Sequence, residues 1–194
     1  MELLDNYMPQ TSFSSYEEFA EKFKINVPEN FDFARDIVDQ WAQLEPEKKA
    51  LVYCDDNGFE RTFTFTEVSE RSKRMAQYFV SLGIGPGDRV ITLLRRRWEY
   101  WIIAVALHRM GAVQLTTKDI SYRIDSAEAK MLIAIDDEFV RAQIAPLKDQ
   151  CETLHHILIV GDNPVTDYHD FNNEYPEFDL YDQPVNRTND DEMV

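Results

Sequence analysis

Arg89-Val90-Ile91-Thr92-Leu93-Leu94 is the most informative stretch of this sequence, and a helical pattern over residues 98–110 and then Gly111 follow it. Residues 89–94 are rich in β-branched and other apolar side chains without polar alternation, which is typical of a strand buried on both faces. Gly111 suits the left-handed position that ends a helix. A strand that leads into such a helix is the unit from which parallel sheets are built.

The same unit recurs toward the C-terminus, with a helix that opens at Thr116 or Thr117 and runs to Ala127, and a helix from Asp137 to about Gln150. Strand–helix repetition of this kind indicates an α/β fold with a parallel sheet flanked by helices. The predicted strands are about 89–94, 112–115, 131–135 and 156–160.

Toward the N-terminus the pattern changes to a β-hairpin, with strands at 51–54 and 59–63 joined by a turn over residues 55–58. Thr64 and Glu67 then form a capping box that opens a long helix, which Gly83 ends. Two short helices are expected earlier, at about 15–23 and 34–44.

The strand at 112–115 has unusually little room. About five residues separate Gly111 from the next helix, whereas a typical strand alone takes about five or six residues and its connections more. We therefore expect a strand of three or four residues, buried side chains at Val113 and Leu115, and a shift of a neighbouring helix.

Residues 161–194 differ in composition from the rest of the chain, because they combine many acidic residues with five aromatic ones. Disordered tails are poor in aromatic residues. We interpret the segment as an irregular, extended acidic tail that lies against a neighbouring surface outside this chain, and we place a subdomain boundary between residues 160 and 161.

The composition restricts the function class. The 194 residues suit one domain, and a formal charge of −16 argues against nucleic acid and anionic lipid as partners. The start of the chain has no secretory pattern, and the longest apolar run, Tyr100 to Leu107, is too short for a membrane span. We expect a cytoplasmic protein in which Cys54 and Cys151 are buried, reduced thiols.

Gly83-Ile84-Gly85-Pro86-Gly87 resembles a phosphate-binding loop only in composition. A nucleotide fingerprint follows a strand and opens a helix, so that backbone N–H groups meet the phosphate. Here the glycines follow a helix and precede a strand. A helix C-cap joined to a turn is the simpler interpretation.

Two further groups lie where predicted strands end. Arg95-Arg96-Arg97 follows the strand at 89–94, where an open sheet binds ligands, so these arginines either bind an anion or form surface ion pairs. Asp136-Asp137 either holds Mg²⁺ or caps the next helix.

The histidines show no metal-ligand spacing, and no nucleophile with a positioned base is evident. We therefore predict no catalytic, cofactor-binding or metal-binding residue in this chain. The four histidines are His108, His155, His156 and His169.

An ordered series of phrases resembles a known family. The phrases are Phe31-Asp32-Phe33-Ala34-Arg35-Asp36, Thr62-Phe63-Thr64-Phe65-Thr66-Glu67-Val68, Leu82-Gly83-Ile84-Gly85-Pro86-Gly87-Asp88-Arg89-Val90, and Glu99-Tyr100-Trp101 running to Met110-Gly111-Ala112-Val113. Together they resemble the N-terminal region of the AMP-forming acyl-CoA synthetases of the adenylate-forming ligase superfamily, in the medium-chain, acetyl-CoA-synthetase-like branch. The resemblance runs from about residue 15 to 194.

The resemblance implies an enzyme that joins a carboxylic acid to CoA with ATP and Mg²⁺, through an acyl-adenylate, and that releases AMP and pyrophosphate. The family's catalytic motifs, a Thr/Ser/Gly-rich phosphate loop and a later lysine, are absent from these 194 residues. The implied role is thus scaffold of an incomplete synthetase, inactive by itself. Its implied partners are the remainder of the synthetase or further copies of this chain.

The chain departs from the family after Val113, where about half a dozen residues are missing before Thr116. The alternative to an incomplete synthetase is a non-catalytic or vestigial α/β binding module.

Overall fold

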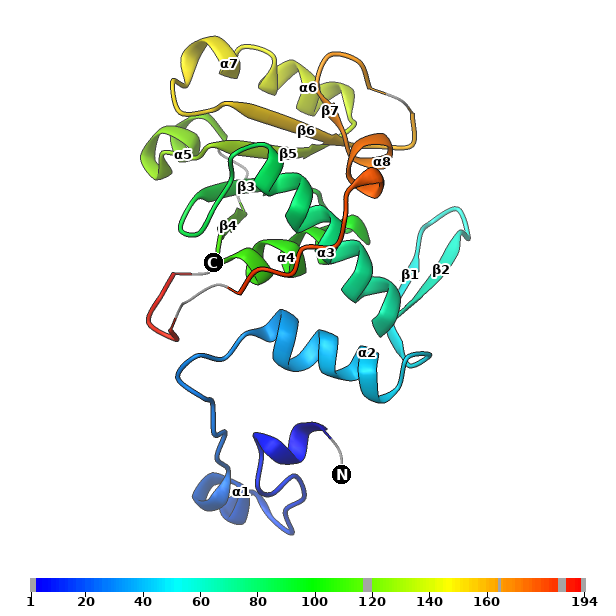
Figure 1. The fold of residues 1–194 in the computed structure, drawn as a ribbon, viewed down its shortest axis with the longest axis vertical. Coiled ribbons are helices and arrows are strands. Elements are labelled where there is room, and N and C mark those ends of the chain that lie inside the picture. The colour runs from blue at the N-terminus through cyan, green and yellow to red at the C-terminus, as the bar shows by residue number, and fades with distance from the viewer. Residues whose placement is uncertain (1–2, 117–119, 164, 185–187, 193–194) are drawn as a thin grey trace.

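The computed structural model describes residues 3–116, 120–163, 165–184 and 188–192 (Figure 1). It shows an α/β fold in which five parallel strands form one sheet, in the order β4-β3-β5-β6-β7, and an antiparallel hairpin forms a second one. The strands are β1 Lys49–Cys54, β2 Glu60–Thr64, β3 Arg89–Leu93, β4 Val113–Thr116, β5 Met131–Ile135, β6 His156–Val160 and β7 His169–Asp170.

Helices occupy most of the chain between the strands. The longer ones are α3 Phe65–Ser81, α4 Glu99–Met110, α5 Ile120–Ala127 and α6 Glu138–Ile144, with α1 Tyr16–Lys22 and α2 Gln40–Leu44 toward the N-terminus. The shorter elements are η1 Leu3–Asn6, the π-helix η2 Phe33–Asp39, α7 Leu147–Gln150, α8 Phe171–Glu174 and η3 Tyr175–Glu177.

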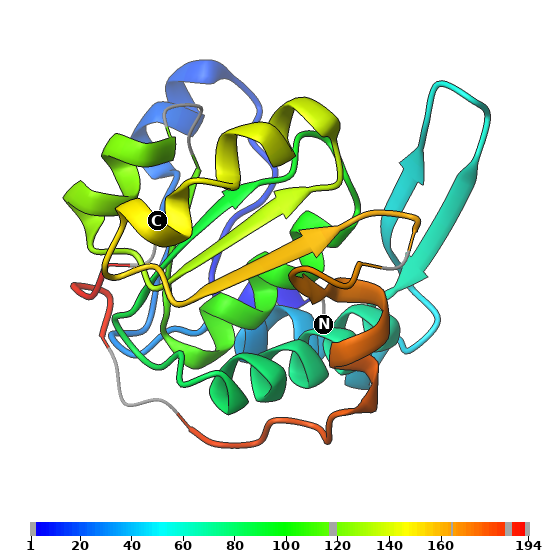
Figure 2. The ribbon, with the colours of Figure 1, turned by 90° about the horizontal axis from the view of Figure 1, so that it is seen from above.

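The helices lie in two layers, one on each face of the parallel sheet (Figure 2). Successive side chains of a strand point to opposite faces. On β5, Ile133 packs with α3 and α4, whereas Leu132 and Ala134 pack with α5, α6 and α7. Both faces are therefore buried, which explains the continuous apolar runs from which these strands were predicted.

The shortened strand is present as predicted. β4 has four residues, one position later than expected, so Thr116 ends the strand and does not open the next helix, whose described part is α5, Ile120–Ala127. Val113 is 4% exposed, while Leu115 is only partly buried at this sheet edge. The predicted start of α5 at Thr117 lies outside the described residues.

Two predicted helices are each divided in the structure. The helix expected over residues 34–44 consists of η2 and then α2, and the helix expected over 137–150 consists of α6 and α7. Pro146 explains the second division, because proline has no N–H to continue the hydrogen-bond ladder and its ring crowds the preceding turn.

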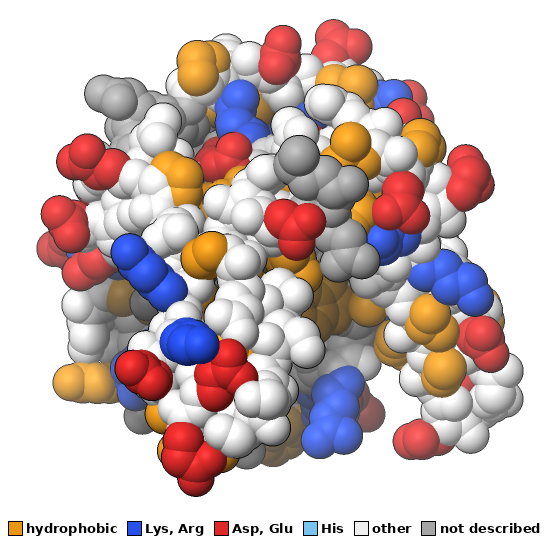
Figure 3. Space-filling model, turned by 90° about the horizontal axis from the view of Figure 1, so that it is seen from below, with side chains coloured by type: hydrophobic (Ala, Val, Ile, Leu, Met, Phe, Trp, Pro, Cys, Tyr) orange, Lys and Arg blue, Asp and Glu red, His pale blue; other side chains and the backbone are white. Residues whose placement is uncertain are grey.

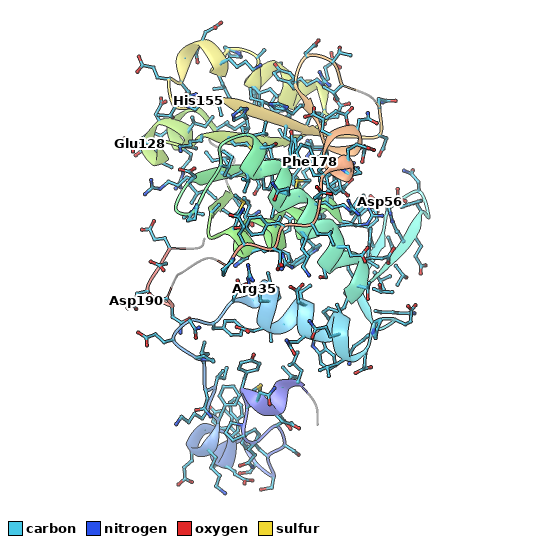
Figure 4. All side chains as sticks on the ribbon, in the orientation of Figure 1. Arg35, Asp56, Glu128, His155, Phe178 and Asp190 are labelled. Carbon is cyan, nitrogen blue, oxygen red and sulfur yellow. The ribbon has the colours of Figure 1, made fainter. Side chains whose placement is uncertain are left out.

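The C-terminal segment packs on this chain rather than on an outside surface, so that part of our interpretation was wrong. β7 adds a fifth strand to the sheet, and Phe171, Tyr175 and Tyr181 are buried in the core beside α3. Residues 178–184 run along α3 (Figures 1 and 4), where the Tyr181 N–H donates to the Lys73 carbonyl at 3.3 Å. The apolar contacts with α3 account for the aromatic residues of this segment.

A buried ion pair joins three helices under the sheet. The Arg109 guanidinium of α4 donates to both carboxylate oxygens of Asp39 in η2, at 2.7 and 2.9 Å, and to the Ser72 hydroxyl of α3 at 3.2 Å. Ser69 of α3 donates to the same carboxylate at 2.6 Å. The sequence reasoning missed this cluster.

The N-terminal arm, residues 3–30, lies beyond α2 and away from the sheet (Figure 1). None of the residues of α1 is buried, although Phe19 packs its ring against Phe13 and Phe23. Acidic, basic and hydrophobic side chains are interspersed over the face that Figure 3 shows.

Candidate functional site

The clearest candidate site is a cleft of about 470 Å³ between the hairpin and the carboxyl edge of the parallel sheet. Residues 51–54 of β1 line one side, and residues 95–98 with Tyr100 and Trp101 line the other. A second hollow of about 490 Å³ adjoins it, shares Arg95, Tyr100 and Thr116, and reaches Arg123 of α5. Open α/β sheets bind their ligands at this edge.

Arg95 occupies the turn directly after β3 in a left-handed conformation, with φ of 51°. A non-glycine residue adopts this conformation only at some cost, so the turn is held by its surroundings. Its guanidinium lies 3.4 Å from the Asp137 carboxylate, and its side chain remains 62% exposed. Arg95 is therefore only partly neutralised and stays accessible from the cleft.

Arg97 is paired far more tightly than Arg95. Its guanidinium donates to both carboxylate oxygens of the buried Glu99, at 2.6 and 3.1 Å, and to Asp162 at 3.3 Å. The hydrogen bonds with Glu99 raise the pKa of Arg97, so its positive charge is secure. Ion pairing was thus the right alternative for Arg97 and, more loosely, for Arg95. Arg96 is exposed and makes no ion pair with any described residue.

The two aspartates after β5 are engaged within the fold. Asp137 accepts hydrogen bonds from the N–H groups of Phe139 and Val140, which makes it the N-cap of α6. Asp136 pairs with Arg141 at 2.5 Å. Within the described ranges, no three His, Cys, Asp or Glu side chains are grouped in a way that suits a metal ion. The helix-cap alternative is therefore confirmed for Asp137.

The glycine segment is a helix C-cap, as the simpler interpretation predicted. Gly83 has φ of 77°, and the N–H groups of Gly83 and Ile84 donate to the carbonyls of Val80 and Phe79 at 2.9 and 3.0 Å. These two bonds define the Schellman motif that ends a helix. The Gly85 N–H is taken by the Asp88 carboxylate at 2.8 Å, so this loop does not cradle a phosphate.

Two of the histidines converge in a cluster that sequence reasoning missed. His156 Nδ1 lies 3.2 Å from His169 Nε2, and His169 Nδ1 lies 3.0 Å from the Glu174 carboxylate, to which Tyr78 also donates at 3.0 Å. The two histidines are neighbours because β7 pairs with β6, and β7 itself has no apolar pattern that would reveal it.

The cysteines differ from our expectation in one case. Cys151 is buried, whereas Cys54 is exposed at the end of β1 and lines the cleft. Position 54 falls on the solvent side of the hairpin, which explains the difference. Among the described residues, no helix combines the length and the apolar character that crossing a bilayer requires.

Comparison with known proteins agrees with this architecture. Residues 38–194 match the family model described as "AMP-binding enzyme". The mitochondrial acyl-coenzyme A synthetase ACSM3 of Mus musculus is 36% identical over 162 residues, which is 77% of this chain and 28% of the mouse protein. ACSM5 of Mus musculus is 35% identical over 148 residues, which is 70% of this chain and 25% of that protein.

Among solved structures, the anthranilate CoA ligase AuaEII in complex with anthranoyl-AMP has a similar fold. The TM-score is 0.73 at 22% sequence identity, over 85% of this chain and 32% of the ligase. This chain thus spans about a quarter to a third of the length of the proteins it matches. With the family model matched from residue 38 to residue 194, the chain belongs to the AMP-binding enzyme family.

Proposed function

We propose that this chain is the N-terminal scaffold of an AMP-forming acyl-CoA synthetase, which joins a carboxylic acid to coenzyme A with ATP. The observation that carries the proposal is the 36% identity to mouse ACSM3 over 77% of the chain. The implied cofactors of the complete enzyme are ATP, Mg²⁺ and CoA, and the implied partner is the remainder of the synthetase.

The described residues of this chain do not by themselves fit Mg²⁺ and ATP. The glycine segment is a helix cap whose N–H groups are engaged within the protein, and Asp136 and Asp137 are held by Arg141 and Arg95. Adenylation depends on clamping the phosphates electrostatically. We therefore assign no step of the reaction to these residues.

The scaffold role rests on how the fold presents its sheet edge. Strands β3, β5 and β6 are buried on both faces, so they hold the turns at their carboxyl ends in fixed positions. Sites on rigid elements are more precise than sites on free loops. In the proposed enzyme, these turns support a reaction centre supplied by other parts of the polypeptide.

The proposal predicts that the 194-residue chain alone catalyses no ATP–pyrophosphate exchange with acetate, butyrate, octanoate or benzoate. Exchange above a no-protein control that disappears on heating would contradict it. The measurement uses radiolabelled pyrophosphate, which detects a single adenylation step without CoA.

The location of the protein remains a proposal as well. We expected the cytoplasm, whereas the names of the ACSM relatives place those proteins in mitochondria. Cell fractionation with an antibody to this chain would distinguish the two compartments. Self-association of the chain is likewise a prediction, which its elution volume would test.

A further inference from the structure

The hairpin strand β1 pairs with β2 on one side, and no other described strand pairs with it. We propose that the free edge of β1 binds an extended acidic segment of a partner protein, which adds a third strand to the hairpin. Strand addition to an exposed edge is a recurring mode of peptide recognition, in which backbone hydrogen bonds provide affinity and side-chain pockets provide specificity.

The backbone groups needed for such pairing are available on β1. The Asp55 N–H donates to the Phe59 carbonyl at 3.0 Å, and the register then places Tyr53 opposite Arg61 and Val52 opposite Thr62. Hydrogen-bonded and non-hydrogen-bonded pairs alternate along an antiparallel ladder. The N–H and C=O groups of Val52 and Cys54 therefore point away from β2, toward the free edge.

The cleft at this edge has room for an extended segment. It follows four successive residues of β1, Leu51 to Cys54, and a strand of four residues is about 13 Å long. The hairpin stands away from the body of the molecule (Figure 2), and Asp56 lies at its tip (Figure 4). Small domains usually cover or charge such edges, and here the opposite wall leaves a cleft of about 470 Å³.

Charge identifies the kind of segment that fits. None of the described residues that line the cleft is acidic, although the chain as a whole carries a formal charge of −16. Glu99 and Asp162 neutralise the charge of Arg97. Among the described residues, Arg95 forms an ion pair only with Asp137, and Arg96 has no ion-pair partner. These two arginines favour a carboxylate-rich segment and disfavour a basic one.

Apolar surface at the same place favours alternation in the partner's sequence. Val52 and Trp101 are 49% and 53% exposed as residues. Side chains of an added strand alternate between its two faces. A segment with alternating acidic and apolar residues thus meets the arginines with one set of side chains and the apolar wall with the other.

Cys54 makes the proposal measurable, because it is an exposed thiol on this edge while Cys151 is buried. The probe is a capped eight-residue peptide of alternating glutamate and valine, and the readout is the rate of alkylation of each cysteine by iodoacetamide, followed by mass spectrometry. We expect the peptide to slow alkylation of Cys54 saturably and at least tenfold, and to leave Cys151 unchanged.

Three comparisons separate strand addition from other forms of binding. A lysine–valine peptide tests charge, and a glutamate–proline peptide, which has few N–H groups to donate, tests backbone pairing. Both should bind at least tenfold more weakly. Arg96→Glu should weaken the glutamate–valine peptide at least tenfold, whereas Lys24→Glu, the same charge change on the exposed N-terminal arm, should leave its affinity unchanged.

Hydrogen exchange gives an independent readout that does not depend on a variant. Peptide binding should slow exchange of the Val52 and Cys54 amides and leave those of Leu51 and Tyr53, which face β2, unchanged. The proposal is overturned if the glutamate–proline peptide protects Cys54 equally, or if the lysine–valine peptide binds as well. Protection of Cys54 that rises with protein concentration alone would also overturn it, because a second copy would then occupy the edge.

Discussion

Arg109 shows how much a single side chain contributes to this fold, because it is 1% exposed and still carries a charge. Burial raises the pKa of Asp39, but hydrogen bonds and the charge of Arg109, with smaller effects of Ser69 and Lys73, outweigh burial and hold that pKa below its usual value. The sequence places Arg109 within an apolar helix. It gave no indication of the partner, since Asp39 lies 70 positions earlier in the chain.

Replacing Asp39→Asn should lower the free energy of unfolding by about 3 kcal/mol, because a buried guanidinium then lacks its countercharge. Urea denaturation at neutral pH measures the change. Glu47→Gln, at an exposed position, serves as the control and should stay within about 0.5 kcal/mol of the original protein. A loss below about 1 kcal/mol for Asp39→Asn would show that Arg109 finds another partner.

His156 should make stability depend on pH. Burial and the nearby charge of His169 lower the pKa of His156, and His155 and Lys148 act in the same direction. On the other side of His169 lie Glu174 and Tyr78. Because the folded pKa is depressed, the unfolded chain binds the proton more readily. The contribution to stability is then present above the ordinary histidine pKa of about 6.5 and is lost as the pH falls.

The test compares unfolding free energies at about pH 7.5 and about pH 5.5, on either side of the usual histidine pKa. His156→Gln should show a smaller loss between the two values than the original protein. His155→Gln, at an exposed position, should lose nearly as much as the original protein, because His155 has only a small effect on the pKa of His156. Equal losses in all three proteins would exclude His156 as the source.

At the level of elements, the sequence predicted best where burial imposes a pattern. Strands β5 and β6 were predicted at their observed limits, because both faces of the sheet demand apolar side chains. β7 was missed, since two residues, His169 and Asp170, carry no such pattern and pair only because the chain returns to the sheet. Pairing between distant segments is not encoded in local sequence.

The end of α3 offers a matched test of helix capping. Gly83→Ala should lower the free energy of unfolding by about 1–2 kcal/mol, because alanine is strained at φ of 77°. No atom lies within 4 Å of the added Cβ, so the cost comes from the backbone and not from a clash. Gly85→Ala is the control, since Gly85 has an ordinary φ, and thermal unfolding of both variants measures the difference. Equal effects would contradict the capping account.

At the level of the whole molecule, the family and the sheet could be predicted from the sequence, whereas only one of the two walls of the cleft could be. Arg95, Arg96 and Arg97 were expected at the carboxyl edge of the sheet, because strand ends converge there. The opposite wall could not be foreseen, since nothing in the local pattern of β1 says where the hairpin lies against the sheet. For the same reason Cys54 was wrongly expected to be buried.

We propose that this chain supplies the scaffold of an acyl-CoA synthetase and needs the rest of the enzyme for chemistry. The most direct measurement is ATP–pyrophosphate exchange by a chimera in which residues 38–194 replace the matching part of mouse ACSM3. We expect exchange by the folded chimera, and none by the remaining part of ACSM3 or by this chain alone. A folded chimera without exchange, even after the segment of ACSM3 between Val113 and Ile120 is restored, would contradict it.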